Sequence, residues 1–253
     1  MVGTIVTPLA LEVSSLTYAY PDGTFALRDV SFSVTNGERV AILGANGAGK
    51  TTLVLHLNGV LGGGPGEIHV GGLRVEKANM RECRRRVGIV FQDPDDQLFM
   101  PTVAQDVAFG PANLGLTGDV LATAVDDALE AVGMAHVGER APHHLSFGQR
   151  RRVAVATVLA MQPELLVLDE PTSNLDPASR RELSDVVRHL DLTVLIVTHD
   201  LPYALELCPR TLILNDGTIA ADGPTIELLA DEALMTANRL ELPFGFDARR
   251  FAP

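Results

Sequence analysis

The residues with the clearest chemical potential run from Gly44 to Thr51, in the order Gly-Ala-Asn-Gly-Ala-Gly-Lys-Thr. A glycine, four spacers and then Gly-Lys-Thr are typical of a loop whose backbone N–H groups surround phosphate oxygens. The apolar runs 40–43 and 53–55 predict the strand before the loop and the helix after it that this mechanism requires, which a plain glycine-rich turn does not. We therefore predict a nucleotide triphosphate site, with Lys50 at the β- and γ-phosphates and Thr51 ligating Mg²⁺. Its expected residues are Gly44, Asn46, Gly47, Ala48, Gly49, Lys50, Thr51 and Thr52.

A second chemical signal is the acidic pair Asp169 and Glu170, which follows the apolar run 165–168. Paired carboxylates after a buried strand suit two tasks, in which Asp169 holds the Mg²⁺ shell and Glu170 polarises the water that attacks the γ-phosphate. Taken alone, such a pair is more often a helix or turn cap. Its position downstream of a phosphate loop favours the catalytic interpretation.

Gln92 and His199 also follow apolar runs, at residues 87–91 and 193–197. Ligands of open α/β sheets bind at the carboxyl ends of the strands, so both side chains are expected at the nucleotide. His199 can hydrogen-bond a γ-phosphate oxygen, although a lone histidine is more often structural. Tyr20 and Tyr18 can each stack on adenine or pack at a sheet edge, and Tyr20 is the better candidate because it adjoins the turn at 21–23.

The elements that must position these residues follow from the hydrophobic pattern. Residues 9–20 and 25–34 predict an antiparallel β-layer, and the apolar runs already named predict buried parallel strands. Residues 215–217, Asn-Asp-Gly, predict a hairpin. Helices are expected at 102–109, 119–132, from the Ser146 cap to 161, at 177–190 and from 224, with an irregular segment near 243–246.

Composition narrows the function further. The chain of 253 residues has 20 Lys+Arg against 32 Asp+Glu, a net charge of -12, which disfavours binding to nucleic acid or to anionic lipid. Cys83 and Cys208 have no paired spacing, which indicates reduced thiols rather than a disulfide or zinc site. With no apolar stretch of about 18 residues and no secretion signal, we expect a soluble protein inside the cell.

In this order, the motifs resemble those of the ATPase subunit of ATP-binding cassette transporters. The family's signature matches residues 145–149, its aspartate loop matches 173–176, and the likeness spans residues 9 to 223. The resemblance implies an α/β fold: a P-loop NTPase core at 1–92 and 146–223, with an antiparallel β-subdomain and an inserted α-helical subdomain at 93–145. The C-terminal tail, 224–253, has no assigned role.

In that family two subunits close head to tail around two ATP molecules, as a homodimer or with a paralogue. The likeness implies that Gln92 senses Mg²⁺ and water, that Glu170 is the base and that His199 clamps the γ-phosphate. It also implies that Ser146, Gly148 and Gln149 meet the partner's ATP and that Asp176 links the two sites. The expected sets are therefore Glu170, His199, Gln92 and Lys50 for catalysis, and Thr51, Gln92 and Asp169 for the metal, with ATP and Mg²⁺ as ligands.

One residue departs from the family pattern, because Phe147 occupies a position that is usually glycine. A phenyl ring beside a phosphate cannot donate a hydrogen bond and can block close approach. The milder interpretation is that the ring points away from the nucleotide and packs on the helical lobe, while the backbone N–H still binds.

The segment 90–115 is similar to the energy-coupling-factor importers, in particular those for cobalt or nickel. That likeness implies a transmembrane coupling subunit and a substrate-binding membrane subunit as partners, at the cytoplasmic face of the membrane. A vitamin such as biotin remains open as substrate. The alternatives are a soluble cassette ATPase acting on nucleic acid or ribosomes and a regulatory subunit without turnover. The basic runs 84–86 and 150–152 are expected on solvated or salt-bridged helix faces.

Overall fold

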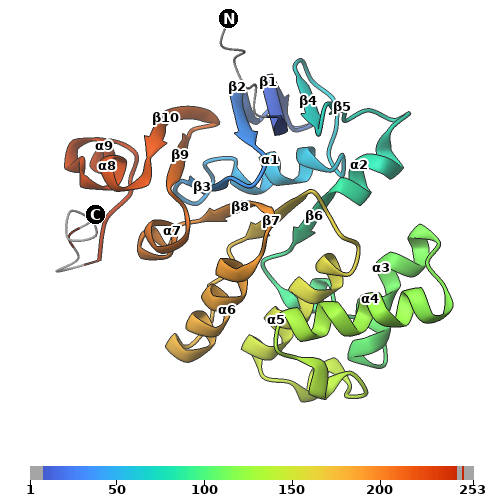
Figure 1. The fold of residues 1–253 in the computed structure, drawn as a ribbon. Helices are drawn as coiled ribbons and strands as arrows, with labels where there is room; N and C mark the ends of the chain where they lie inside the picture. The colour runs from blue at the N-terminus through green and yellow to red at the C-terminus, as the bar shows by residue number, and fades with distance from the viewer. Residues whose placement is uncertain (1–7, 244–246, 248–253) are drawn as a thin grey trace, which may run out of the picture.

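The computed structural model describes residues 8–243 and 247, in which two β-sheets are stacked over a group of helices (Figure 1). The smaller sheet is antiparallel, in the order β2-β1-β4-β5. It contains the two predicted strands, β1 (Leu9–Ala19) and β2 (Phe25–Thr35), and a short hairpin, β4 (Glu67–Val70) and β5 (Leu73–Arg74), that the sequence analysis missed. Two- and four-residue strands are too short to carry a clear alternation.

The larger sheet has the order β10-β9-β3-β8-β7-β6 and holds the candidate site. Its strands are parallel except for β10, which pairs antiparallel with β9 in the predicted hairpin. The bounds are β3 (Arg39–Leu43), β6 (Val87–Val90), β7 (Leu165–Asp169), β8 (Thr193–Thr198), β9 (Arg210–Asn215) and β10 (Thr218–Pro224). The continuous apolar runs arise because both faces of this sheet are buried.

Alternate residues of these strands enter two separate cores. Val40 and Ile42 of β3 face a core shared with the antiparallel sheet and with α1 (Lys50–Leu57), whereas Ala41 and Leu43 face the core formed with the other helices. Those include α5 (Phe147–Leu159), α6 (Pro177–His189) and α7 (Leu201–Leu207), the last unforeseen because seven residues hardly establish a helical period. The larger sheet therefore lies between two layers. One is formed by α1 and the antiparallel sheet, and the other by the remaining helices.

The helical lobe consists of α3 (Val103–Leu114) and α4 (Gly118–Ala131), packed against α5. Both predicted helices are confirmed, and α3 continues past the predicted end through Pro111. Because α5 also packs on β6 and α6, it joins the lobe to the sheet. Three short 3₁₀ turns lie at Pro94–Asp96, Ala135–Val137 and Pro142–His144, and α2 (Met80–Arg86) precedes β6.

After β10 the tail forms α8 (Thr225–Ala230) and α9 (Glu232–Ala237), as the helical prediction from 224 required. α8 packs against α7, β9 and β10, and Thr225 is buried with its hydroxyl against that of Thr211, 2.8 Å away. The irregular segment predicted near 243–246 falls largely outside the described residues. In the described part of the chain, every helix is too short or too polar to cross a lipid bilayer.

Candidate nucleotide site

The candidate site lies at the carboxyl edge of the larger sheet. Strand register aligns the ends of the central strands, since Leu43 pairs with Thr198, Asp169 with Val197 and Val90 with Leu168. The residues that directly follow these strands therefore meet along one edge. A cavity of about 410 Å³ opens there, lined by Tyr20, Thr24, Phe25, Ala26, Asn46, Gly47, Gly49, Lys50, Thr51, Thr52, Gln92, Glu170 and His199.

The loop between β3 and α1 is shaped by glycine. A Cβ on Gly44 would lie 2.4 Å from the carbonyl oxygen of Leu214, and one on Gly49 would lie 2.4 Å from that of Ala26. Gly47 and Gly49 have φ of +82° and +103°, a region that L side chains rarely adopt. The backbone can thus curl closely around a small anionic group at the N-terminus of α1, which is what a phosphate requires.

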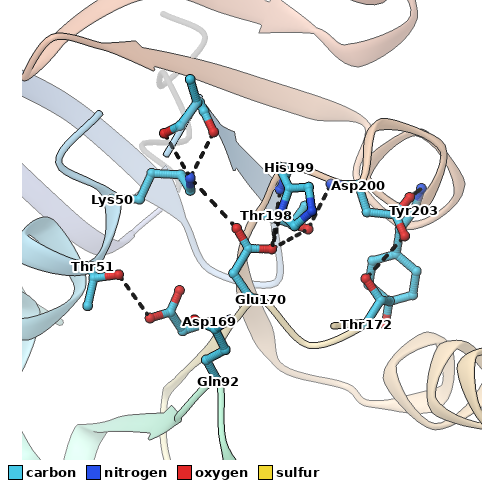
Figure 2. Close-up of polar contacts among 12 residues, drawn as sticks. Lys50, Thr51, Gln92, Asp169, Glu170, Thr172, Thr198, His199, Asp200 and Tyr203 are labelled. Carbon is cyan, nitrogen blue, oxygen red and sulfur yellow. Dashed lines mark hydrogen bonds and ion pairs between the residues drawn. The ribbon is translucent and has the colours of Figure 1, made fainter. Parts of the chain in front are cut away.

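Lys50 is the buried cation of this loop. Its Nζ donates to the carbonyl oxygens of Gly44 at 2.7 Å and Ala45 at 3.2 Å, and lies 3.7 Å from Glu170 Oε1 (Figure 2). The charge is therefore held at the mouth of the phosphate loop and directed towards the acidic pair. The same ammonium group could form an ion pair with a phosphate bound in the loop.

Glu170 lies at the centre of a polar cluster. Its Oε2 accepts from His199 Nδ1 at 2.8 Å, from Thr198 Oγ1 at 3.2 Å and from the His199 backbone N–H at 3.3 Å (Figure 2). The backbone of Glu170 has φ of 45°, an uncommon conformation for a side chain-bearing residue that tends to occur at functional sites. Thr198 was not among the residues predicted from the sequence, where its position directly before His199 was the available signal.

Asp169 lies beside Thr51, with 3.4 Å between its Oδ2 and the threonine hydroxyl (Figure 2). Burial, reinforced by the Glu170 carboxylate, raises the pKa of Asp169 to about 6. Its Oδ1 is buried without a hydrogen-bond partner among the described residues. Hard oxygen ligands with an unpaired carboxylate oxygen suit Mg²⁺, so these residues fit that ion.

Two aromatic side chains border the cavity on the antiparallel sheet. Tyr20 is 37% exposed, and its hydroxyl is 2.9 Å from Thr52 Oγ1. Phe25, which the sequence analysis did not consider, is 51% exposed and lies under the Arg28 guanidinium. Its position after the predicted turn was the signal that could have identified it. Either ring is available for stacking on a base.

The predicted residues of the signature and the aspartate loop lie outside this cavity, at the N-termini of α5 and α6. Ser146 caps α5 in a reciprocal capping box with Gln149, at 3.2 Å and 3.0 Å. Asp176 caps α6, accepting from the backbone N–H groups of Ala178 and Ser179. Gly148 adjoins this second turn, because a Cβ there would be 2.4 Å from Ser179 Oγ. The two groups therefore meet each other and not the chain's own cavity.

The interpretation of the basic run 150–152 is wrong for its middle residue. Arg150 and Arg152 make ion pairs with Asp95 at 2.9 Å and Glu182 at 3.0 Å, as expected of a salt-bridged helix surface. Arg151 is fully buried and donates to backbone carbonyl oxygens instead. The reason is that α5 is covered on nearly all sides by the lobe and the sheet, so one arginine of three consecutive ones must point inward.

Comparison with known proteins agrees with this geometry. The family model described as ABC transporter matches residues 27–173. A putative ABC transporter ATP-binding protein from Streptomyces coelicolor is 72% identical over 242 residues, covering 96% of this chain and 93% of that protein. The energy-coupling factor transporter ATP-binding protein EcfA of Methanothermobacter thermautotrophicus is 48% identical, covering 92% of this chain and 76% of its own length.

The same holds for a solved structure, that of CbiO1 from Clostridium perfringens, described as part of the ABC transporter complex CbiONQ. It superimposes with a TM-score of 0.82 at 38% identity, covering 93% of this chain and 96% of the other. The chain belongs to the ABC transporter family. Its likeness to EcfA and CbiO1 confirms the resemblance to ATPase subunits of the energy-coupling-factor type, and with it the expected α/β fold and ATP as the ligand.

Proposed function

We propose that this chain hydrolyses ATP in the cavity at the sheet edge to power import, as the nucleotide-binding subunit of an energy-coupling-factor transporter. The observation that carries the proposal is the meeting of Lys50, Gln92, Glu170 and His199 around one cavity, although they lie far apart in the sequence. If Glu170 were only a turn cap and His199 only a structural residue, they would not be expected to line the same cavity.

The residues of the cavity have distinct tasks in this mechanism. The loop from Gly44 to Thr52 binds the phosphates through its N–H groups, and Lys50 balances their charge. Thr51, Asp169 and Gln92 would hold Mg²⁺, which would neutralise phosphate charge when bound. Tyr20 stacks on the adenine, with Phe25 as a second aromatic surface nearby.

Glu170 acts on the water that attacks the γ-phosphate. Its carboxylate orients the water and accepts its proton, while the adjacent His199 imidazole, 62% exposed at the cavity, holds the γ-phosphate. The hydrogen bonds from Thr198 and His199 fix the carboxylate in one orientation. Catalysis thus depends mainly on positioning and charge.

Two subunits would be needed for complete sites. Ser146, Gly148 and Gln149 at the start of α5 would bind the ATP held by a second subunit, and Asp176 would link the two sites. Support comes from their location: exposed Ser146, half-buried Gln149 and buried Gly148 lie beside the N-terminus of α6, away from the chain's own cavity. The second subunit is either another copy or a paralogue.

The membrane partners would contact the helical lobe at the cytoplasmic face of the membrane. Phe99 and Phe109 are 61% and 46% exposed, with ring centroids 4.9 Å apart in an edge-to-face pair. An exposed aromatic pair next to the glutamine loop suits docking of an apolar segment from a transmembrane coupling subunit. A separate membrane subunit would bind the substrate, for which we propose cobalt or nickel ions, with a vitamin such as biotin as the alternative.

The test begins with co-purification of the chain with its native partners, their identification, and assays of ATPase activity and vesicle uptake. Membrane partners and ATP-dependent uptake of Co²⁺ or Ni²⁺ support the proposal, and uptake of biotin instead changes only the substrate. Soluble partners alone, with ATPase activity stimulated by DNA or ribosomes, would refute the transport role while leaving the catalytic site intact.

A further inference from the structure

The middle arginine of α5 is buried although it carries a charge. Arg151 is 0% exposed, while its two neighbours reach carboxylates at the surface. Removing a guanidinium from water costs free energy unless its N–H groups find fixed acceptors. The acceptors of Arg151 therefore indicate what the residue is for.

Those acceptors are the backbone carbonyls of the glutamine loop. Arg151 Nη1 donates to the carbonyl oxygen of Phe91 at 2.7 Å, and Nη2 donates to that of Gln92. Within the described residues, no carboxylate is close enough to form an ion pair with Arg151. The planar fork thus grips two consecutive carbonyls, a geometry that fixes the backbone where Gln92 leaves the sheet.

Neighbouring contacts hold the same segment from other sides. The amide of Gln97 accepts from the backbone N–H of Phe91 at 3.2 Å and donates to the carbonyl oxygen of Ala154 in α5 at 2.8 Å. Arg150 adds its ion pair with Asp95. The segment 91–97 is consequently bound to α5 directly at the C=O of Phe91 and, for its N–H, through the Gln97 amide, so the loop and the helix form one hydrogen-bonded unit.

Phe147 completes this arrangement. Its half-buried ring lies over the Arg151 guanidinium, with 5.4 Å from Cζ to the ring centroid, and over that of Arg150 at 5.7 Å. A cation facing an aromatic ring is stabilised and shielded from water. The ring that departs from the family's glycine thus packs on the arginines of its own helix.

We propose that Arg151 is a positioning residue for Gln92, which makes the place of Gln92 in the cavity depend on the position of α5. The inference rests on the proposed function, in which Gln92 serves Mg²⁺ and the start of α5 meets the partner's ATP. Ser146 and Arg151 are five residues apart on one helix, about 8 Å at 1.5 Å per residue. A partner's nucleotide bound at Ser146 therefore shifts or stabilises α5 and, with it, the Arg151 hydrogen bonds that position Gln92. The two nucleotide sites of the dimer are coupled in this way.

The test is a double-mutant cycle between Arg151 and Gln92 in the full chain with its partners. Arg151→Gln should lower kcat about tenfold and raise the Mg²⁺ concentration for half-maximal rate by a similar factor. Nucleotide binding measured in EDTA should change by less than about twofold, because the phosphate loop is untouched. In the Gln92→Ala background, Arg151→Gln should have almost no further effect on either kinetic quantity.

The conservative Arg151→Lys variant keeps the test informative if Arg151→Gln fails to fold. Arg151→Lys keeps the charge but grips one carbonyl rather than two, so we expect about a threefold loss in kcat that also vanishes in the Gln92→Ala background. Arg152→Gln is the matched control, since Arg152 pairs with Glu182 and the carbonyl of Val132 instead. Its effect should be the same in both backgrounds.

Equal losses from Arg151 substitution with and without Gln92 would overturn the inference, and so would failure of both Arg151 variants to bind nucleotide, because the arginine would then serve stability alone. Failure of the proposed function is recognised separately. In that case the unsubstituted complex lacks Mg²⁺-dependent ATPase activity or drives no uptake, whatever Arg151 does.

Discussion

At the scale of single residues, the cavity concentrates charge on a few buried groups. Lys50 and Glu170 are 7% exposed each and Asp169 is 5% exposed. The unpaired Oδ1 of Asp169 and the hydrogen bonds that converge on Glu170 distinguish the two neighbouring carboxylates among the described residues. Asp169 keeps one carboxylate oxygen without a hydrogen-bond partner among the described residues, whereas Glu170 is held in place by a histidine and a threonine.

Glu170→Gln should abolish hydrolysis but keep nucleotide binding. The amide is nearly isosteric and cannot accept the proton of the attacking water, so kcat should fall by about a hundredfold or more. The ATP-bound form should then accumulate as a stable dimer, visible by size-exclusion chromatography with ATP. Glu227→Gln, at an exposed position of α8, is the control. Normal turnover in Glu170→Gln would remove Glu170 from the mechanism.

Asp169 should make Mg²⁺ binding and stability depend on pH. Its pKa in the folded chain is about 6 against an ordinary value of 3.8, so between these values the folded state holds a proton that the unfolded state has lost. The free energy of unfolding should therefore fall as pH rises from about 4 to 6. At pH 7, Asp169→Asn should be more stable by on the order of 2 kcal/mol, and the difference should vanish below about pH 4.

Urea denaturation at several pH values measures this effect. Mg²⁺ titrations over the same range provide a second readout, because the protonated carboxyl of Asp169 is a poor ligand and Mg²⁺ affinity should weaken below about pH 6. A stability difference between Asp169→Asn and the unsubstituted chain that is independent of pH would contradict the raised pKa.

At the scale of elements, the N-termini of α5 and α6 meet without room for a side chain. A Cβ on Gly148 would lie 2.4 Å from Ser179 Oγ and 2.6 Å from Ser179 Cβ. The glycine of the signature is thus required by packing within the chain, in addition to any role at the partner's nucleotide. The two requirements can be separated experimentally.

Gly148→Ala should lower the free energy of unfolding by about 1–2 kcal/mol, because it forces α5 away from α6. Ser179→Gly removes both crowded atoms, so the double variant should regain most of the loss caused by Gly148→Ala. If stability returns in the double variant but ATPase activity of the dimer does not, Gly148 also touches the partner's ATP. Additive losses in stability would contradict the packing argument.

At the scale of the whole molecule, the chain connects the cavity at the edge of the larger sheet to the helical lobe of α3 and α4. α5 packs on both the sheet and the lobe, and the segment 91–97 connects the cavity to the Phe99 and Phe109 pair. A partner docked on that pair would be linked to Gln92 through the segment 91–97. In the proposed function, this connection would let ATP turnover drive a separate membrane protein.

Phe99→Ser should uncouple the chain from its partners without harming its own chemistry. Loss of an exposed aromatic anchor typically weakens an interface by about 2 kcal/mol, roughly a thirtyfold change in affinity. Co-purification and uptake should fall, while nucleotide binding by the isolated chain stays unchanged. Val60→Ser, which alters another exposed apolar residue, 53% exposed, is the control. Unaltered uptake in Phe99→Ser would exclude this docking surface.

The sequence by itself determined the longer strands, the major helices and most of the polar cavity residues, because these depend on local patterns, whereas the short β4 and β5 strands and Phe25 escaped it. Period-two burial, caps such as Ser146 and a loop of fixed spacing are properties of short segments. Gln92, Glu170 and His199 could be placed near the phosphate loop of Lys50 because each of them, like that loop, comes after a strand, and parallel strands end at a common edge.

Only the tertiary structure decided which residues those segments meet. That Arg151 grips the glutamine loop, that Gly148 packs on Ser179 and that Thr198 supports Glu170 depend on contacts between segments distant in sequence. The raised pKa of Asp169 likewise arises from burial and from a neighbouring charge. Such effects follow from the packing of whole layers, and residue order alone does not show which distant segment is placed against a given side chain.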